Sequence, residues 1–321
     1  MPINNFRNIT TTGFNEDALT TFSPNEDVRN FAILTTLGDL ANGIFVGADG
    51  VSVTNFGQID TSGSGAEGVL IEGAEAHVRN FGSIVTHGEP TSDSLFFNEA
   101  IAVIGDNFEL QNWGRLETHG FGSQGMFGQG DGGLIDNWGV LEATGDFSGG
   151  MFAIGNGGLL RNFGSISTSG FLADGMLVAG DDNYLINFGT ITIHDPVTPG
   201  MTAFGSHNEL VNFGTITGNG FMVSGDPFSG FDNTVTNWGT ISKDGDEPAM
   251  AAEGSDALAQ NFGTIDCFRI ALIAQADMGA QVRNTGTVTT HGEDGVGMFA
   301  DTSEGGEAAN AGVLRRFQLL D

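Results

Sequence analysis

The chain has 321 residues, of which 40 are acidic and 10 basic, giving a formal net charge of −30. Such a surface repels nucleic acid phosphates and anionic lipid headgroups, so we expect no nucleic acid partner. No run of 18 apolar residues occurs, which also predicts no membrane insertion. Hydrophobic residues make up 39%, including 26 phenylalanines, and this favours a packed core over the disorder typical of acidic, glycine-rich chains.

The compartment is only weakly indicated. The single cysteine, Cys267, excludes an intrachain disulfide. Met1 leads directly into the first repeat, without the basic start and apolar segment of a signal peptide. We therefore expect a cytosolic protein, a protein exported by a route that needs no N-terminal signal, or a processed form.

One unit, Asn-Phe-Gly-x-Ile-x-Thr-x-Gly, recurs along the whole chain, mostly every 25 residues. The residues two before and four after its asparagine are apolar in every copy, and polar residues alternate with them, as in β-strands. The asparagines, which we call anchors, are Asn5, Asn30, Asn55, Asn80, Asn112, Asn137, Asn162, Asn187, Asn212, Asn237, Asn261, Asn284 and Asn310.

A further short apolar segment bounded by glycine, such as residues 44–46, precedes most anchors. Strands this short bury a core only when coils stack at about 4.8 Å. The pattern predicts an all-β, single-domain β-solenoid (β-helix) over residues 1–321, with about 13 coils of ~25 residues and three short strands per coil. We expect the anchors at an inner bend, with left-handed backbone and side chains that hydrogen-bond between coils.

Two irregularities interrupt the period. Seven extra residues between Asn80 and Asn112 predict a loop insertion at 89–99, where Phe96 and Phe97 would contact a neighbour or receptor. Residues 310–321 form an incomplete terminal coil. Neither end shows a capping element, so we expect head-to-tail self-assembly through apolar residues of both ends, namely Ile3, Phe6, Val313, Leu314, Phe317, Leu319 and Leu320. The alternative is that the last residues fold across the end as a small cap, which would give a monomer.

The column after the anchor is aromatic from Phe6 to Phe262. It is core if the bend turns it inward, or an interaction stripe if it faces outward. A methionine column that includes Met126 and Met151 is interpreted as packing.

Metal binding is a weaker possibility. His87 and His119 stand at equivalent positions of adjacent coils, about 5 Å apart, and acidic turns such as Asp181 and Asp182 offer Ca²⁺ ligands. Exposed turn residues are the simpler interpretation, so we expect no cofactor other than, at most, Ca²⁺.

The units Asn187-Phe-Gly-Thr-Ile-Thr192 and Asn212-Phe-Gly-Thr-Ile-Thr217 resemble passenger repeats of bacterial autotransporters and filamentous-haemagglutinin-like adhesins. The resemblance covers essentially the full chain, although the second repeat position here is aromatic where that family has a small polar residue. It implies an extracellular or cell-surface β-helix. We therefore expect a non-enzymatic structural protein that assembles into a surface filament, matrix or biofilm fibre, with itself and surface or matrix components as partners.

Three alternatives stay open. The first is a monomeric adhesin that binds a host or surface glycan. The second is an ice-binding protein, because outward threonines such as Thr190 and Thr192 form a two-column array on successive coils. The third is a polysaccharide-degrading enzyme, which would need convergent carboxylates or a basic residue beside a metal. Lys243 is the only lysine, and the coils are too uniform to indicate one privileged cleft.

Overall fold

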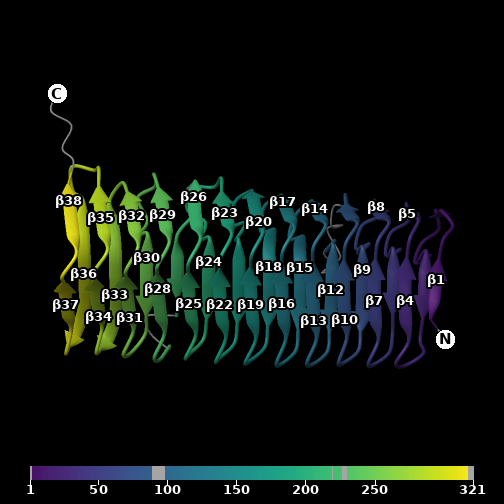
Figure 1. The fold of residues 1–321 in the computed structure, drawn as a ribbon, viewed down its shortest axis with the longest axis horizontal. Helices are drawn as coiled ribbons and strands as arrows, with labels where there is room; N and C mark the ends of the chain where they lie inside the picture. Colours follow the sequence, from purple (N-terminus) through teal and green to yellow (C-terminus); the bar gives the residue numbers. More distant parts are fainter. Residues whose placement is uncertain (1, 89–97, 219, 226–229, 317–321) are drawn as a thin grey trace. The chain divides into compact units, whose positions relative to one another are not determined.

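The computed structural model describes residues 2–88, 98–218, 220–225 and 230–316, and these form an all-β parallel β-solenoid with three strands per coil. This confirms the predicted fold class. The chain divides into two compact units, Met1–Ala173 and Asp174–Asp321. Within each unit, equivalent strands of successive coils lie side by side (Figure 1) and build three parallel sheets, which we call A, B and C.

Unit 1 contains seven coils. Its sheet A comprises β1 (Ile3–Asn5), β4 (Asp27–Asn30), β7 (Ser52–Asn55), β10 (His77–Asn80), β13 (Glu109–Asn112), β16 (Leu134–Asn137) and β19 (Leu159–Asn162). Its sheet B comprises β2 (Ile9–Thr11), β5 (Ile33–Thr36), β8 (Gln58–Thr61), β11 (Ser83–Thr86), β14 (Arg115–His119), β17 (Val140–Thr144) and β20 (Ser165–Ser169). Its sheet C comprises β3 (Leu19–Thr21), β6 (Ile44–Val46), β9 (Val69–Glu72), β12 (Ile101–Ile104), β15 (Gln124–Gln129) and β18 (Gly149–Ile154).

Unit 2 repeats the arrangement. Its sheet A comprises β22 (Tyr184–Asn187), β25 (Glu209–Asn212), β28 (Thr234–Asn237), β31 (Leu258–Asn261), β34 (Gln281–Asn284) and β37 (Glu307–Asn310). Its sheet B comprises β23 (Thr190–Ile193), β26 (Thr215–Gly218), β29 (Thr240–Lys243), β32 (Thr264–Cys267), β35 (Thr287–Thr290) and β38 (Val313–Arg316). Its sheet C comprises β21 (Met176–Ala179), β24 (Met201–Phe204), β27 (Met222–Ser224), β30 (Met250–Glu253), β33 (Ile270–Met278) and β36 (Val296–Glu304).

The core of each unit is built from in-register columns of aliphatic side chains. Leu34 aligns with Ile59, and Ile59 with Ile84, and all three are buried. Met126 and Met151 are buried in the same way, which confirms that the methionine column is packing. Each such side chain contributes about 1.5–3 kcal/mol on burial, so the three-sided core, not any single strand, holds the coils together.

The anchor asparagines form a buried amide ladder within each unit. In unit 1, Nδ2 of Asn30 donates to Oδ1 of Asn55 at 2.9 Å, and Asn55 to Asn80 at 2.9 Å. Nδ2 of Asn30 also donates to the carbonyl of Ala32 at 2.9 Å, which closes the local bend. The ladder and the inner bend were predicted correctly. The expectation of left-handed backbone was wrong, because no described anchor has a positive φ.

The glycine of the repeat is required because backbones approach closely at this bend. A Cβ on Gly82 would lie 1.9 Å from the carbonyl oxygen of Gly57, and one on Gly114 would lie 2.0 Å from that of Gly82. Glycine therefore fills this position from Gly57 onward, whereas the first two coils carry Arg7 and Ala32 there.

The aromatic column faces outward, so the core alternative was wrong. Phe6 is 71% exposed and Trp238 51%. In unit 1 the rings of Phe31 and Phe56 stack at 5.0 Å with 8° between their planes, and in unit 2 those of Phe188 and Phe213 stack at 5.2 Å and 6°. Because the anchor before each ring points inward, alternation places the ring on the outer face.

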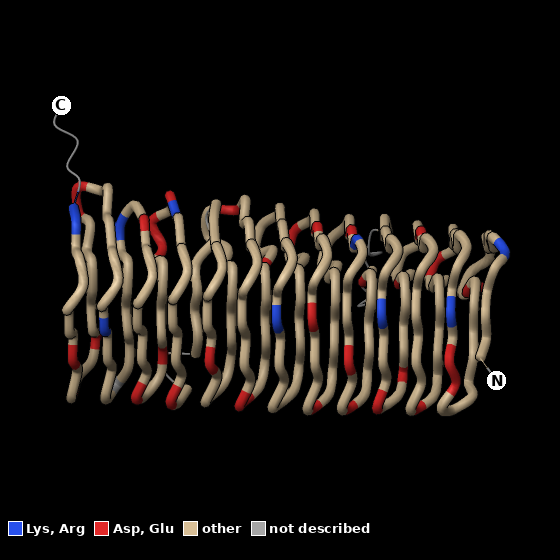
Figure 2. The backbone as a smooth tube through the Cα atoms, in the orientation of Figure 1, with Lys and Arg blue, Asp and Glu red and all other residues tan. Residues whose placement is uncertain are grey.

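Acidic residues recur at the turns of successive coils in each unit, and basic residues are few (Figure 2). Many of these carboxylates satisfy backbone groups of the next coil. Oδ1 of Asp106 accepts the amide of Asp131 at 2.9 Å, and Oδ1 of Asp131 accepts that of Asn156 at 2.8 Å. The acidic turns are thus a second, hydrogen-bonded ladder. In the described part of the chain, no helix has the length and apolar character needed to cross a membrane.

Candidate functional site

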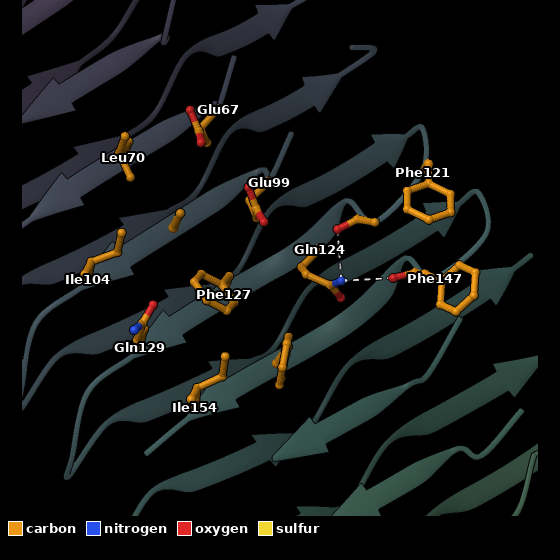
Figure 3. Close-up of a pocket in the computed structure, with 13 residues that line it drawn as sticks. Glu67, Leu70, Glu99, Ile104, Phe121, Gln124, Phe127, Gln129, Phe147 and Ile154 are labelled. Atoms are coloured by element: carbon orange, nitrogen blue, oxygen red, sulfur yellow. Dashed lines mark hydrogen bonds between the residues drawn. The ribbon is translucent and has the colours of Figure 1, made fainter. Parts of the chain in front are cut away.

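A hollow of about 550 Å³ opens on the outer face of sheet C in unit 1 (Figure 3), and we call it the sheet C groove. A second hollow of about 430 Å³ continues it toward the first coil and shares Glu67 and Leu70 with it. The groove is lined by Glu67, Leu70, Glu99, Ala102, Ile104, Phe121, Gly122, Gln124, Phe127, Gln129, Phe147, Phe152 and Ile154.

The floor of the groove is apolar because outward positions on four consecutive strands carry apolar side chains. Leu70, Ala102 and Phe127 are in register on β9, β12 and β15, and Phe127 aligns with Phe152 on β18. The rings of Phe127 and Phe152 meet edge to face at 5.5 Å and 62°. Unlike the stacked aromatic column, this arrangement leaves ring faces open to a ligand.

One wall of the groove is formed by two turn phenylalanines. Phe121 and Phe147 are each 45% exposed, and their rings tilt at 49° with centroids 5.1 Å apart. Nε2 of Gln124 donates to the carbonyls of Gly122 at 3.1 Å and Phe147 at 3.2 Å (Figure 3). Gln124 therefore ties the two turns together and fixes the wall.

Two glutamates stand side by side at the head of adjacent strands. Glu67 lies two residues before Val69, the first residue of β9, and Glu99 lies two residues before Ile101, the first residue of β12. Val69 and Ile101 are aligned in the sheet, so the two glutamates are neighbours on adjacent coils. The amide of Gly68 donates to the carbonyl of Glu99 at 2.9 Å. Both side chains border the groove (Figure 3), although the residues are only 8% and 5% exposed.

Burial makes these two carboxyl groups weak acids. Burial, together with the neighbouring Glu99, raises the pKa of Glu67 to about 9. Burial alone raises the pKa of Glu99 to about 8. Each carboxyl has a hydrogen bond with its own backbone, which lowers its pKa by less than burial raises it, and no basic residue lines the groove. Both carboxyls are therefore mainly protonated at neutral pH and can donate hydrogen bonds.

The predicted metal candidates are not brought together. In unit 1 the rings of His87 and His119 stack at 5.1 Å, as their spacing predicted, but Nε2 of His119 pairs with Glu117 at 2.9 Å. In unit 2, Oδ1 of Asp181 accepts a hydrogen bond from the backbone amide of Ser206 at 2.8 Å. Oδ1 of Asp182 lies 3.6 Å from Nδ1 of His207. No group of three or more metal-ligating side chains occurs among the residues that the structure describes.

The predicted assembly residues are placed only in part. Ile3 is half-buried and Phe6 exposed on the first coil, and Val313 and Leu314 are exposed on the last described coil. The others, Phe96, Phe97, Phe317, Leu319 and Leu320, lie outside the described residues. Asn98, which follows the insertion, is buried, and its Nδ2 donates to the carbonyl of Gly88 at 2.5 Å.

The only lysine of the chain and the arginine Arg161 both interact with residues outside the groove. Lys243 is buried, with Nζ 4.7 Å from the centroid of the Phe221 ring, and burial lowers its pKa. The Arg161 guanidinium pairs with Asp136 at 2.7 and 2.8 Å, which raises the pKa of Arg161. Neither residue lines the groove.

Glu67 and Glu99 were missed by the sequence reasoning. The insertion separates them by 32 residues, so the common period of 25 does not align them. A signal existed, since both stand thirteen residues before the following anchor, in the same column as Asp17 and Gln124. Each also interrupts an otherwise small or apolar segment.

Comparisons with known proteins place the chain in a family. No curated protein and no solved structure matches it. A family model described as the BigA third pectate lyase-like domain matches residues 25–220, which is more than half of the chain and includes every residue that lines the sheet C groove. The chain therefore belongs to the family of the BigA third pectate lyase-like domain.

Proposed function

We propose that this protein is a non-enzymatic adhesin of the cell surface or extracellular matrix, and that it binds a glycan in the sheet C groove. The observation that carries the proposal is an open aromatic groove bordered by two buried carboxyl groups, with no basic residue in its lining. Family membership and the resemblance to adhesin repeats support a surface role. The location at the cell surface or in the extracellular matrix is part of the proposal.

A glycan fits the groove's chemistry better than other ligands do. Ligand sites combine apolar and aromatic walls with a few placed polar groups. The C–H faces of a sugar ring pack on aromatic faces such as those of Phe127 and Phe152, and its hydroxyls hydrogen-bond to groups at the rim. Glu67, Glu99 and Gln129 supply such groups along a surface that spans four strands. A long, open groove of this kind accepts a segment of a polymer.

Binding without cleavage follows from the state of the carboxyls. Glycoside hydrolysis pairs a protonated acid with an ionised carboxylate that serves as base or nucleophile. Here the pKa values of Glu67 and Glu99 are both raised, to about 9 and about 8, so both are mainly protonated at neutral pH. A lyase would need a basic residue at the site, and none lines the groove.

The outward aromatic column is a poorer glycan site. Its rings cover one another, as Trp138 and Phe163 do at 3.8 Å and 8° in unit 1 and Trp238 and Phe262 do at 4.0 Å and 8° in unit 2. Mostly ring edges stay exposed, whereas sugars pack on ring faces.

Glycan-array screening followed by calorimetry tests the proposal. Phe127→Ala and Phe152→Ala should each weaken binding by about tenfold or more, because each removes one aromatic face. Phe204→Ala is the matched control, since Phe204 is an exposed outward residue of sheet C in unit 2. A wild-type protein that binds no glycan, or that releases new reducing ends from a bound one, would contradict the proposal.

We also propose head-to-tail assembly, on a separate observation. Leu314 belongs to the inward column of sheet B, yet it is 45% exposed, whereas Val288 and Ile265 beneath it are fully buried. A further layer on this coil would bury Leu314, and the occupant proposed is the first coil of a second copy. Light scattering and negative-stain microscopy should show rods that Leu314→Asp shortens. A sharp monomer peak at high concentration, with and without calcium, would contradict assembly.

Ice binding has weaker support. The outward pairs Thr190 with Thr192 and Thr215 with Thr217 lie on adjacent strands of sheet B in unit 2, but Asp266 interrupts the array two coils beyond Thr217. It stays a prediction, which thermal hysteresis of the purified protein would test.

A further inference from the structure

Resting on the proposed glycan-binding function, we propose that the sheet C groove selects an uncharged glycan and binds it through protonated Glu67 and Glu99. Each carboxyl group donates a hydrogen bond to a sugar oxygen, and ionisation of the pair releases the ligand. The protein would therefore bind neutral polysaccharide at neutral and mildly acidic pH and lose it in alkaline medium.

The geometry of the pair comes first. Glu67 and Glu99 occupy one column on adjacent coils, so their backbones are about 4.8 Å apart. Both residues are more than nine-tenths buried. Two like charges at such a spacing and depth repel strongly, and a counter-charge would be needed to hold both ionised. The lining of the groove offers no lysine, arginine or histidine.

The charged groups around the pair are acidic. Glu67 faces Glu99 on the next coil, and Asp17 and Glu72 are close enough for their charges to raise its pKa further. Burial also raises the pKa of Asp17. An anionic sugar, such as a uronate or a sulfated residue, would bring a negative charge into this acidic surface. A neutral sugar meets no charge repulsion there and gains hydrogen-bond donors from the two protonated carboxyl groups.

The protonated form supplies what a sugar needs. A neutral carboxyl presents one O–H donor and acceptor oxygens, whereas a carboxylate only accepts. Each carboxyl has a hydrogen bond with its own backbone, and its remaining donor and acceptor capacity borders the groove. A ligand hydroxyl can use that capacity, so the groove favours ligands that carry hydroxyl groups.

Calorimetry with paired oligosaccharides tests the inference. Neutral glucan, mannan and galactan fragments and polygalacturonate fragments of equal length are titrated near pH 6, near pH 7 and at about pH 9.5. We expect a neutral oligosaccharide to bind at the two lower values and to bind about tenfold or more weakly at the highest. Circular dichroism at each pH confirms that the protein stays folded.

Three variants separate donation from charge. Glu67→Gln with Glu99→Gln should keep binding and abolish its pH dependence, because an amide donates but does not ionise in this range. Glu67→Ala with Glu99→Ala should weaken binding at every pH. Glu307→Gln, at an exposed carboxylate of β37 in unit 2, is the control and should preserve the pH dependence.

Other outcomes overturn the inference in distinct ways. Preference for polygalacturonate, tighter binding at about pH 9.5, a requirement for added calcium, or loss of binding in the double glutamine variant would each show that ionised carboxylates bind the ligand. Any of these would leave glycan binding itself intact. Absence of binding by every oligosaccharide at every pH would instead reject the proposed function.

Discussion

The outer face of sheet C differs between the two units at the position just before each strand. In unit 1 this position holds Glu67, Glu99 and Gln124, and all three line the groove. In unit 2 it holds Asp174, followed by residues such as Pro199 and Pro248, and the two prolines offer no hydrogen-bonding side chain. The inward columns are alike in both units. The inward positions therefore specify the coil, while the outward positions can differ between coils and form a binding site.

Buried carboxyl groups make the contrast sharper. Asp174, in unit 2, accepts a hydrogen bond from Oγ1 of Thr202 at 3.1 Å, and burial raises its pKa to about 7. In unit 1, Ala102 stands at the corresponding position relative to Glu67, so Glu67 has no hydroxyl beside it. A side chain of the next coil therefore holds Asp174 in the structure, whereas no such side chain holds Glu67, which borders the groove.

The largest expected effect is a pH dependence of stability in unit 1. The folded pKa values of Glu67 and Glu99, about 9 and about 8, exceed those of the unfolded chain, near 4.5. Between these limits the folded state holds more protons, so the free energy of unfolding falls as pH rises from about 5 to about 9. We expect a loss on the order of several kcal/mol in urea denaturation.

The double glutamine variant at these positions should remove most of this loss and be more stable than the wild type at about pH 9. Equal pH slopes in the two proteins would show that the pair is not protonated in the fold.

The next effect tests whether the inward columns are equivalent. Asn112→Ala in unit 1 and Asn212→Ala in unit 2 each leave one buried amide donor and one acceptor without a partner. We expect each to lower the free energy of unfolding by about 2–4 kcal/mol. The exposed Gln58→Ala should change it by less than about 0.5 kcal/mol. A large difference between the two asparagine variants would mean that the ladders are not equivalent.

The smallest effect concerns the partner of a buried acid. Thr202→Val should cost about 1 kcal/mol and raise the pKa of Asp174, because the hydrogen bond lowers it. Ala102→Thr should do the reverse in unit 1 and lower the pKa of Glu67. Side-chain carboxyl NMR titration measures both shifts. Unchanged titration in both variants would show that the hydroxyl does not explain the difference between the units.

Much of the fold could be predicted because the same pattern of apolar and polar residues recurs in every coil. The alternation around each anchor predicts that Leu34 and Ile59 are buried, and this holds for any turn geometry because a short strand has only one face to bury. The site could not be predicted in this way. Glu67 and Glu99 look like ordinary acidic turn residues in a chain with 40 acidic residues, and the insertion hides their common column.

The coil period, the three strands of each coil, the inner amide ladder and the burial of the aliphatic columns can all be predicted from the repeat. Each follows from local spacing and from the need to stack short strands. The folded coils were needed to show that the aromatic column from Phe6 onward faces outward, that Lys243 is buried, and that two glutamates from different coils border one groove. These features depend on which side of a bend a residue occupies and on what the next coil places beside it, and residue type alone encodes neither.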